Sequence, residues 1–542
     1  MNQVKKNILL LVFITFLTSS FGFSQNSILK KEIIDFSIPK NIYFGGERIW
    51  IQAGVSTESG SAPSQIIYAE LLNRYNESVA LTKMPSAHGK AFNYLRIPVN
   101  LPSDHYLLRV FTRVSPYLDL EMGLSQQLVT IFNPRVPPAV VANRKEYLIQ
   151  EDNTDRISLN SKNLRGGEFL ELNLSSITTG VKEIQISAMN PFLENQGLLS
   201  SKELYQSIES RALVPELFGH IVEAKLDQEF ADTTQLYYLS VHGTKSALFT
   251  DRSDTSGSMY FDTGGMKNWR FMVVQANNNL SLVDLSIVSP APKTKFKSEF
   301  NFPILKISPA DEPYLTALLK AGQVEGYFVH EFDSSPFPVV TGFVEDITYR
   351  LDDYTRFESV ETVIKEYVPE TSVRTAQKNK EFRVLDKVRG SIFDSNPLML
   401  IDAMPVFDSD LLAAFNPKEL EKLEVLTRNF YLNEEVFPGV ISFSSYKNDF
   451  GGFPIPTNGI YLDYQGILPK VLDKQELFAT PTDTKMKDWR TVIYWSATDS
   501  DKNFNENLRF RLPANSGVYQ VKVTFLGQNG NLQQVLRTFR ID

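Results

Sequence analysis

Short apolar runs separated by turn-forming residues recur along most of the chain, and they have the pattern of β-strands. The clearest run, at 517–525, alternates apolar and polar side chains, which is typical of a half-buried antiparallel strand. Runs rich in aromatic and β-branched residues at 42–44, 48–53 and 105–111 show the same preference. The pattern predicts a mainly β chain, and a length of 542 residues predicts several domains.

Proline-containing segments mark the boundaries between these domains. Pro134 and Pro137-Pro138 close the first block, because consecutive prolines cannot serve in a central strand. A second segment rich in Pro and Lys, 291–299, is typical of a stiff linker. We therefore expect four folded blocks: a β-sandwich over 26–134, one or two β-sandwiches over 139–290, an α+β domain over 300–450 and an immunoglobulin-like β-sandwich over 455–542.

Helical periodicity occurs in only a few places. Leu204, Ile208 and Arg211 share one helical face, which predicts a helical insert at about 200–212 within the second block. The segment 357–365 has apolar residues at i, i+3, i+6 and i+7, the spacing of an amphipathic helix. This second helix distinguishes the α+β block from its β-rich neighbours.

Charge and composition exclude several kinds of chemistry. Lys and Arg number 55 against 63 Asp and Glu, which gives a formal net charge of −8. A mildly acidic chain without a basic block is a poor match for a phosphate backbone, so we expect no nucleic-acid partner. The chain contains no Cys, which excludes disulfides, thiolate metal sites, Cys nucleophiles and covalent thioesters.

Residues 1–24 have the pattern of a secretory signal peptide. Two lysines precede an apolar run at 8–17, and small residues at positions 22 and 24 match a cleavage site. The apolar run is about half the ~20 residues that a membrane-spanning helix needs, and no other run reaches that length. We therefore expect a mature protein in the periplasm, associated with the outer membrane but not inserted through it. The cell surface and secretion are the alternatives.

Candidate catalytic residues are few. The five histidines lie apart in the sequence and form no zinc-binding pair. Asp352 and Asp353 are adjacent, and neighbouring residues on a strand point to opposite faces, so they do not form a shared acid–base site there. We expect no catalytic residue and no cofactor.

One polar segment has part of the spacing of a calcium loop. Asp499, Asp501 and Asn503 supply oxygen ligands at alternate positions. Phe504 stands where such a loop needs Gly, and Phe510 stands where it needs a bidentate Glu. These three residues are the calcium candidates of the chain, and a polar loop tip between strands is the favoured interpretation.

Two parts of the chain resemble β-sandwich domains of known families. The segment 42–50, with the sequence IYFGGERIW, and the segment 105–112, HYLLRVFT, together resemble the macroglobulin-like domain of bacterial cell-envelope proteins. The segments 219–221 and 254–261 resemble a carboxypeptidase-regulatory-like sandwich in the second half of 139–290. These resemblances imply immunoglobulin-like or macroglobulin-like β-sandwiches.

The α+β block resembles the plug domain of TonB-dependent outer-membrane receptors. The resemblance rests on 396–402 (NPLMLID), 423–426 and 439–441. The plug pattern usually has Gly after the Asp, where this chain has Ala403. The 97 residues after Ser445 are too few for a receptor barrel of about 22 strands of ~10 residues, so transport is not expected. The resemblance implies a plug-like domain used without its barrel in a Gram-negative envelope.

Together these features favour a non-enzymatic, protein-binding scaffold or accessory subunit whose partner is an outer-membrane protein or envelope complex. We expect the main contact surface at about 340–450, with Asp402, Phe407 and Phe437 as contact residues. Two alternatives stay open. One is a secreted hydrolase, acting for instance on polysaccharide, with carboxylates from separate loops. The other is a surface-exported adhesion protein, because 516–523 is similar to the C-terminal sorting domains of the type IX secretion system.

Overall fold

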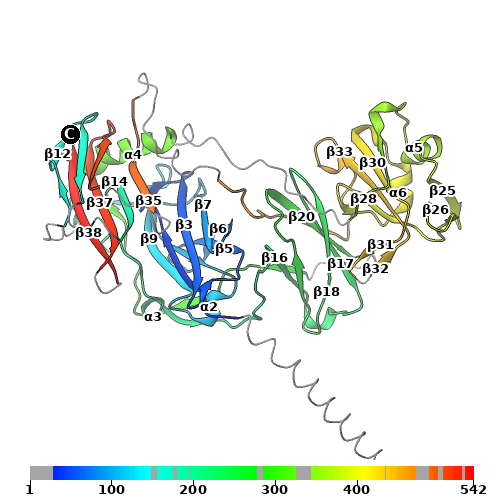
Figure 1. Ribbon diagram of the computed structural model, residues 1–542, viewed down its shortest axis with the longest axis horizontal. Helices are drawn as coiled ribbons and strands as arrows, with labels where there is room; N and C mark the ends of the chain where they lie inside the picture. The colour runs from blue at the N-terminus through cyan, green and yellow to red at the C-terminus, as the bar shows by residue number, and fades with distance from the viewer. Residues whose placement is uncertain are drawn as a thin grey trace, which may run out of the picture. The chain divides into compact units, whose positions relative to one another are not determined.

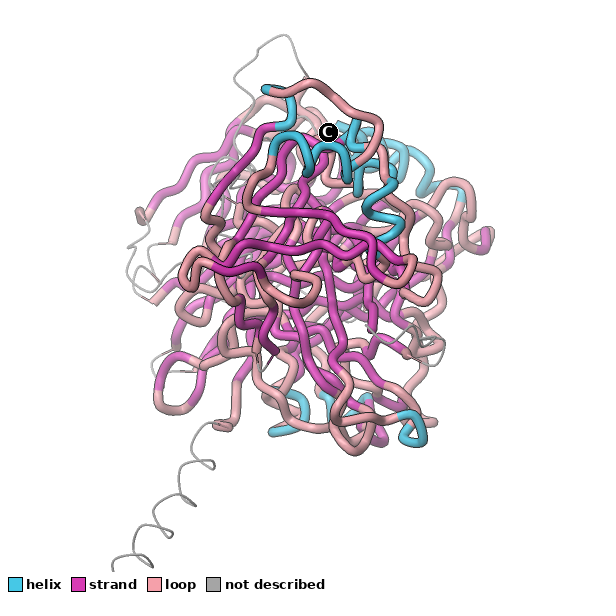
Figure 2. The backbone as a smooth tube through the Cα atoms, turned by 90° about the vertical axis from the view of Figure 1, so that its right-hand side faces the viewer, coloured by secondary structure: helices cyan, strands magenta, loops and turns pink. Residues whose placement is uncertain are grey.

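The chain forms two compact units, each assembled from segments that are far apart in the sequence (Figure 1). Unit 1 comprises Met1–Leu217, Ala291–Phe332 and Lys470–Asp542, and unit 2 comprises Phe218–Pro290 and Asp333–Pro469. Strands make up most of the regular structure of the chain (Figure 2), which confirms the predicted mainly β, multidomain class. The computed structural model describes residues 29–147, 156–174, 177, 180–194, 196–276, 285–324, 343–433, 435–471, 487–497, 505–527 and 531–542.

The first β-sandwich of unit 1 lies within the predicted block 26–134. Its strands form one sheet from β1 (Ile33–Ser37), β3 (Arg48–Thr57), β4 (Gly60–Ser61) and β7 (Lys90–Arg96), and a second sheet from β2 (Ile42–Phe44), β9 (Leu124–Phe132), β8 (Asp104–Phe111), β5 (Ile66–Leu72) and β6 (Ser78–Pro85). Ile49, Ile51, Ala53 and Val55 alternate along β3 and enter the core between the sheets. The two-residue period seen in the sequence therefore sets the inward face of this strand.

The segment predicted as a linker covers the outer face of the five-stranded sheet. Arg109 on β8 forms an ion pair with Glu70 on β5, with 2.5 Å between Nε and Oε2, and both side chains are almost fully buried. The other guanidinium N–H groups donate to the carbonyl of Pro292 at 2.6 Å and to the hydroxyl of Thr294 at 3.0 Å. The linker prediction for 291–299 is wrong here, because these residues complete the hydrogen bonding of a buried cation.

The helical insert expected at about 200–212 is also wrong, because only one helical turn forms. The turn α3 (Ser201–Leu204) leads directly into strand β15 (Tyr205–Ile208), which pairs with β22 (Thr294–Phe296). The rings of Tyr205 and Phe296, which face each other across this pair of strands, stack with their centroids 5.5 Å apart. Strand pairing and ring stacking thus favour extended backbone where apolar spacing alone favoured a helix.

The second β-sandwich of unit 1 combines strands from both ends of the chain. The first of its two sheets contains β11 (Ser158–Leu159), β13 (Phe169–Asn173) and β36 (Asn507–Arg511). The second contains β12 (Asn163–Leu164), β38 (Leu532–Ile541), β37 (Gly517–Leu526), β14 (Val181–Ala188) and β35 (Val492–Ala497). Strand β14 is hydrogen-bonded to β37 on one side and to β35 on the other. The predicted independent sandwich over 455–542 is therefore shared with residues 156–188, because the C-terminal strands pair with early ones.

Unit 2 contains a sandwich into which the α+β domain is inserted. One sheet of the sandwich joins residues 236–276 to a strand from beyond the α+β domain, as Phe271 pairs with Asp463. This sheet contains β18 (Ala247–Arg252), β17 (Leu236–Gly243), β20 (Trp269–Ala276) and β34 (Ile460–Asp463). The other sheet contains β19 (Ser258–Asp262), β16 (Ile221–Lys225) and β21 (Ser286–Val288).

The α+β domain is built on a mixed five-stranded sheet. Its elements are the sheet strands β24 (Ile347–Arg350), β30 (Leu420–Leu426), β33 (Val440–Ser445), β28 (Leu398–Ile401) and β29 (Met404–Pro405), the smaller strands β25 (Thr371–Ala376), β26 (Asn379–Asp386), β27 (Ser391–Ile392), β31 (Phe430–Leu432) and β32 (Glu435–Phe437), and the helices α5 (Val360–Tyr367) and α6 (Ser409–Ala414). Helix α5 confirms the helix predicted at 357–365, and the Ser359 side chain caps it by accepting from the Thr362 N–H at 3.2 Å.

Candidate functional site: an apolar pocket beside helix α4

A pocket of about 430 Å³ lies within unit 1, between the end of the first sandwich and helix α4 (Glu312–Val324). Most of its wall is apolar or proline, and Glu312 is its single titratable lining residue. Its volume matches the size of ordinary ligand pockets. The lining residues are Phe44, Ser103, Phe132, Asn133, Pro134, Pro137, Pro138, Val140, Ile307, Ser308, Pro309, Glu312, Leu315, Thr316 and Leu319.

The loop after β9 forms one wall, and its polar groups are already paired. The Asn133 amide donates to the carbonyls of Val99 at 3.1 Å and Leu101 at 2.7 Å, and its Oδ1 accepts from the Arg135 N–H at 3.0 Å. The Ser103 hydroxyl donates to the Asn133 carbonyl at 3.1 Å. Because these polar atoms are satisfied within the loop, the wall offers a ligand mainly apolar surface.

The prolines after Asn133 lead into a short parallel pair of strands at the pocket. Strand β10 (Ala139–Val140) pairs with β23 (Lys306–Ile307), and the Val141 N–H donates to the Ile307 carbonyl at 2.8 Å. Val140 remains 64% exposed. The pair therefore ties the proline loop to the segment that enters helix α4.

Helix α4 forms the opposite wall because its lining residues recur with helical spacing. Glu312, Leu315, Thr316 and Leu319 stand at i, i+3, i+4 and i+7, so they share one face of the helix. Leu318 lies elsewhere on the helix and is buried in the core of the second sandwich. Leu315 and Leu319 pack, partly buried, against the same core cluster, so the helix face that lines the pocket is itself held in place.

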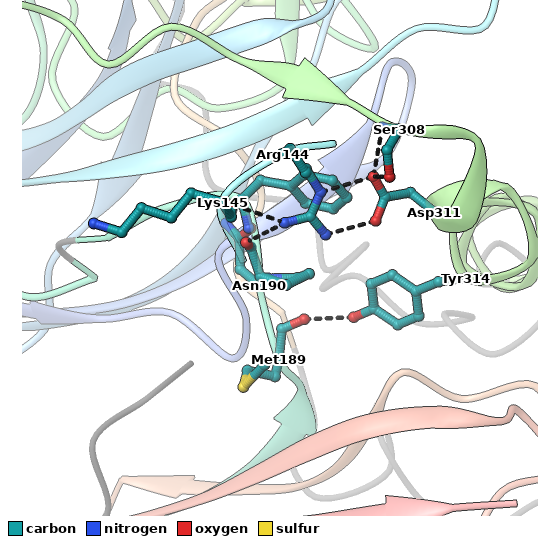
Figure 3. A network of polar contacts seen from close by, with 9 residues as sticks. Arg144, Lys145, Met189, Asn190, Ser308, Asp311 and Tyr314 are labelled. Atoms are coloured by element: carbon teal, nitrogen blue, oxygen red, sulfur yellow. Dashed lines mark hydrogen bonds and ion pairs between the residues drawn. The ribbon is translucent and has the colours of Figure 1, made fainter. Parts of the chain in front are cut away.

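An ion pair and a hydrogen bond fix the start of helix α4 (Figure 3). Arg144 binds Asp311 through two parallel contacts, Nε to Oδ2 at 2.7 Å and Nη2 to Oδ1 at 2.6 Å. The Asp311 carboxylate also accepts from the N–H and the hydroxyl of Ser308, which completes a capping box. One turn further on, the Tyr314 hydroxyl donates to the Met189 carbonyl. These contacts fix the helix before any ligand binds.

The Arg144–Asp311 ion pair stays charged and the Tyr314 hydroxyl stays protonated near neutral pH. Burial acts to raise the pKa of Asp311, but hydrogen bonds from Arg144 and Ser308 outweigh burial and hold that pKa below its ordinary value. Burial raises the pKa of Tyr314, so its hydroxyl stays protonated and able to donate. The anchor therefore persists unchanged through neutral pH.

A close approach at Gly322 fixes the other end of helix α4. A Cβ added at Gly322 would lie 2.2 Å from Oε1 of Glu47. Glu47 is itself held by a buried ion pair with Lys40, at 2.6 Å, and by the Phe44 N–H. A glycine at position 322 lets the helix lie this close to the Glu47 side chain, which follows strand β2, and Phe44 at the end of that strand lines the pocket.

The predicted contact residue Asp402 is placed inside the α+β domain. It is only 4% exposed, and its carboxylate accepts from the N–H and hydroxyl of Ser445, at 2.7 and 2.6 Å, and from the Phe450 N–H at 2.8 Å. Asp402 and Ala403 have φ values of +47° and +64° at the turn between β28 and β29. The side chain that the sequence indicated for a partner therefore stabilises a turn, because three donors of its own domain occupy it.

Phe407 and Phe437 belong to one apolar cluster of unit 2. The Phe407 ring packs edge-on against Tyr238 of the sandwich at 5.1 Å, and the Phe437 ring stacks on Phe430 at 6.3 Å. Both are partly buried by these contacts. The structure brings these two phenylalanines into one cluster, and their role in partner binding stays a prediction.

The calcium candidates Asp499, Asp501 and Asn503 and the signal segment 1–24 lie outside the described residues. Within the described ranges, no group of three or more His, Asp or Glu side chains is placed to hold a metal ion. In the same part of the chain, no helix is both long and apolar enough to cross a membrane.

The sequence did not indicate the pocket as a site. Pro134, Pro137 and Pro138 appeared only as a domain boundary, and helix α4 was not predicted. The apolar spacing of Leu315, Leu318 and Leu319 is the signal that could have identified the helix.

No protein-family model and no curated protein matches the chain. Among solved structures, Salmonella alpha-2-macroglobulin reacted with methylamine aligns with 95% of this chain and 24% of its own, at 9% identity and a TM-score of 0.16. The native conformation of E. coli alpha-2-macroglobulin aligns with 95% of this chain and 23% of its own, at 9% identity and a TM-score of 0.16. The two tandem V-type regions of VCBP3, a v-region-containing chitin binding protein, align over 49% of this chain and 98% of theirs, at 8% identity and a TM-score of 0.14.

The chain thus spans about a quarter of the length of the macroglobulin structures. TM-scores of this size carry no assignment of function. The function is therefore inferred from the residues of the chain itself.

Proposed function

We propose that the chain is a non-enzymatic, protein-binding component of the cell envelope, and that the pocket beside helix α4 receives apolar side chains from an extended segment of its partner. The observation that carries the proposal is the pocket of about 430 Å³ with its mainly apolar lining. Ser103 and Asn133 use their polar groups within their own loop. A partner therefore gains binding energy here chiefly by burying apolar surface.

The lining also supports binding rather than catalysis. Acid–base catalysis needs titratable groups that converge on a substrate, and Glu312 is the single titratable residue of the wall. Among the described residues, strands β10 and β23 pair only with each other, and their outer backbone edges are a place that an extended segment can join. The envelope location and an outer-membrane partner belong to this proposal through the signal-like segment 1–24 and the plug-like pattern of the α+β domain.

Site-specific photocrosslinking in cells tests the proposal. Benzoylphenylalanine replaces Thr316, which is exposed on the pocket face of α4, and in a control chain it replaces Leu532, which is 67% exposed on β38. We expect an envelope protein to crosslink from position 316 and not from position 532. The crosslinked peptide of the partner should be extended and apolar.

A second substitution identifies the pocket as the cause. Val140→Glu places a charge in the pocket wall at an exposed position, so the fold is retained while an apolar side chain is repelled. The crosslink from position 316 should then be lost. A crosslink that persists in Val140→Glu, or one that forms equally from position 532, would contradict the proposed function.

A further inference from the structure

The segment 293–306 of unit 1 combines lysines with aromatic side chains. It contains Lys293, Lys295, Lys297 and Lys306 against a single glutamate, in a chain whose formal net charge is −8. The same segment carries three phenylalanines and an isoleucine. These four are Phe296, Phe300, Phe302 and Ile304, which are half-exposed or exposed, whereas Leu305 is buried.

The aromatic side chains form one half-exposed cluster. The Phe296 ring lies 5.4 Å from that of Phe300 and 5.6 Å from that of Phe302, and the last two lie 5.3 Å apart. Phe296 also stacks on the buried Tyr205, which fixes the cluster to the first sandwich. Ile304 follows directly and is 68% exposed.

The turn between β5 and β6 extends this apolar surface. Arg74 donates to the carbonyl of Pro303 at 3.2 Å, and the Asn76 amide donates to the carbonyl of Thr294. These two bonds place Tyr75, which is 75% exposed, beside the segment. The patch defined by Tyr75, Phe300, Phe302 and Ile304, named here the aromatic patch, therefore gathers residues from two parts of the chain.

Several lysines beside the aromatic patch keep their charge unpaired. Lys295 and Lys306 are exposed, Lys297 is half-exposed, and within the described residues none of the three forms an ion pair. Lys293 makes a long contact with Glu209, 3.9 Å between Nζ and Oε1. Glu77 in the Tyr75 turn and Glu299 in the segment are exposed carboxylates, so the three lysines outnumber them by one, and their ammonium groups attract negative charge.

We propose that the aromatic patch and its lysines are a docking site for an anionic lipid surface. Aromatic and aliphatic side chains partition to the boundary between headgroups and acyl chains, while lysine stems follow them and place their ammonium groups at the phosphates. A purely acidic polypeptide would pair with the lysines but would supply no apolar surface to cover the exposed aromatic and aliphatic side chains. The combination of the two features favours lipid, and the chain binds at the surface without spanning the bilayer.

Sedimentation with vesicles tests the proposal on the purified mature chain. We expect binding to phosphatidylglycerol vesicles, little binding to phosphatidylcholine vesicles, and weaker binding as salt screens the lysines. Lys295→Glu should lower the partition coefficient by about 25-fold, since one charge near an anionic surface contributes about fivefold and the reversal counts twice. Tyr75→Ser with Ile304→Ser should lower it by at least about tenfold through lost apolar burial.

Matched controls separate docking from folding. Leu532→Ser removes an exposed apolar side chain and Lys30→Glu reverses an exposed lysine whose ammonium group contacts Ser59, both elsewhere on unit 1 and outside the patch, and both should bind as the parent chain does. Thermal unfolding confirms that every variant is folded. Equal binding to both vesicle types, an unchanged partition coefficient in Lys295→Glu, or equally tight binding to soluble polyglutamate would overturn the proposal. Val140→Glu leaves vesicle binding intact, which separates this site from the pocket.

Discussion

Removing the guanidinium of Arg144 should loosen helix α4 without unfolding unit 1. Arg144→Leu eliminates both contacts to Asp311 and the donation to the Pro191 carbonyl at 3.0 Å. It also removes the cation that lies 4.3 Å from the Phe192 ring centroid. The Asp311 carboxylate is then left with only the Ser308 donors in a largely buried place.

The expected cost follows from this burial. The Arg144 and Asp311 side chains are 9% and 11% exposed, so they count as a buried pair rather than a surface one. Breaking one partner of a buried pair costs about 3–5 kcal/mol, and we expect the low end because the Ser308 donors remain. Arg144→Lys keeps the charge but loses the parallel geometry, and we expect it to cost about half as much.

Hydrogen exchange of the α4 backbone amides measures this cost locally. A loss of about 3 kcal/mol corresponds to roughly 100-fold faster exchange through local opening. Lys145→Met is the matched control, since Lys145 is 69% exposed and pairs with the exposed Glu194 at 3.3 Å. In this control we expect the free energy of local opening of α4 to change by less than about 0.5 kcal/mol. Equal exchange of α4 in Arg144→Leu and Lys145→Met would refute the role assigned to the ion pair.

Three further predictions concern stability. Burial lowers the pKa of His105 to about 4 and that of His242 to about 3. Because the folded state holds both rings neutral, the free energy of unfolding is highest above the ordinary pKa of 6.5 and declines as pH falls towards 4 and 3. Urea unfolding from pH 7 to 4 should show this decline, and His242→Gln should make it less steep. Gly322→Ala should destabilise unit 1 by about 1–3 kcal/mol in the same assay, since the clash with Glu47 outweighs the ~1 kcal/mol gain in helix propensity; unchanged stability would contradict the close approach. Ala403→Gly should stabilise unit 2 by about 0.5–1 kcal/mol in thermal unfolding, because φ at this position is +64°; a loss would contradict strain at this turn.

Features that depend on neighbouring residues were predictable from the sequence. The alternation at 517–525 corresponds to β37, and the amphipathic spacing at 357–365 corresponds to α5. The plug-like pattern also indicated a special position after Asp402, and the left-handed backbone at Ala403 gives the reason why such a turn favours Gly.

Pairing between distant segments was not predictable. Nothing in residues 181–188 specifies that β14 pairs with strands more than 300 residues later, so the sequence favoured separate sandwiches over 139–290 and 455–542. The pocket depends on the same kind of contact, because Arg144 and Asp311 are separated by 167 residues. Local periodicity indicates which face of an element is buried, but not which element buries it.

Quantitative affinity purification tests the central claim most directly. A C-terminally tagged chain is recovered from gently solubilised envelopes in three forms, the parent, Val140→Glu and Leu532→Ser, and the co-eluting proteins are measured by mass spectrometry. The pocket account predicts a stoichiometric outer-membrane or envelope partner with the parent and Leu532→Ser, lost with Val140→Glu. A partner retained by Val140→Glu, or a parent chain that elutes without any partner, would contradict it.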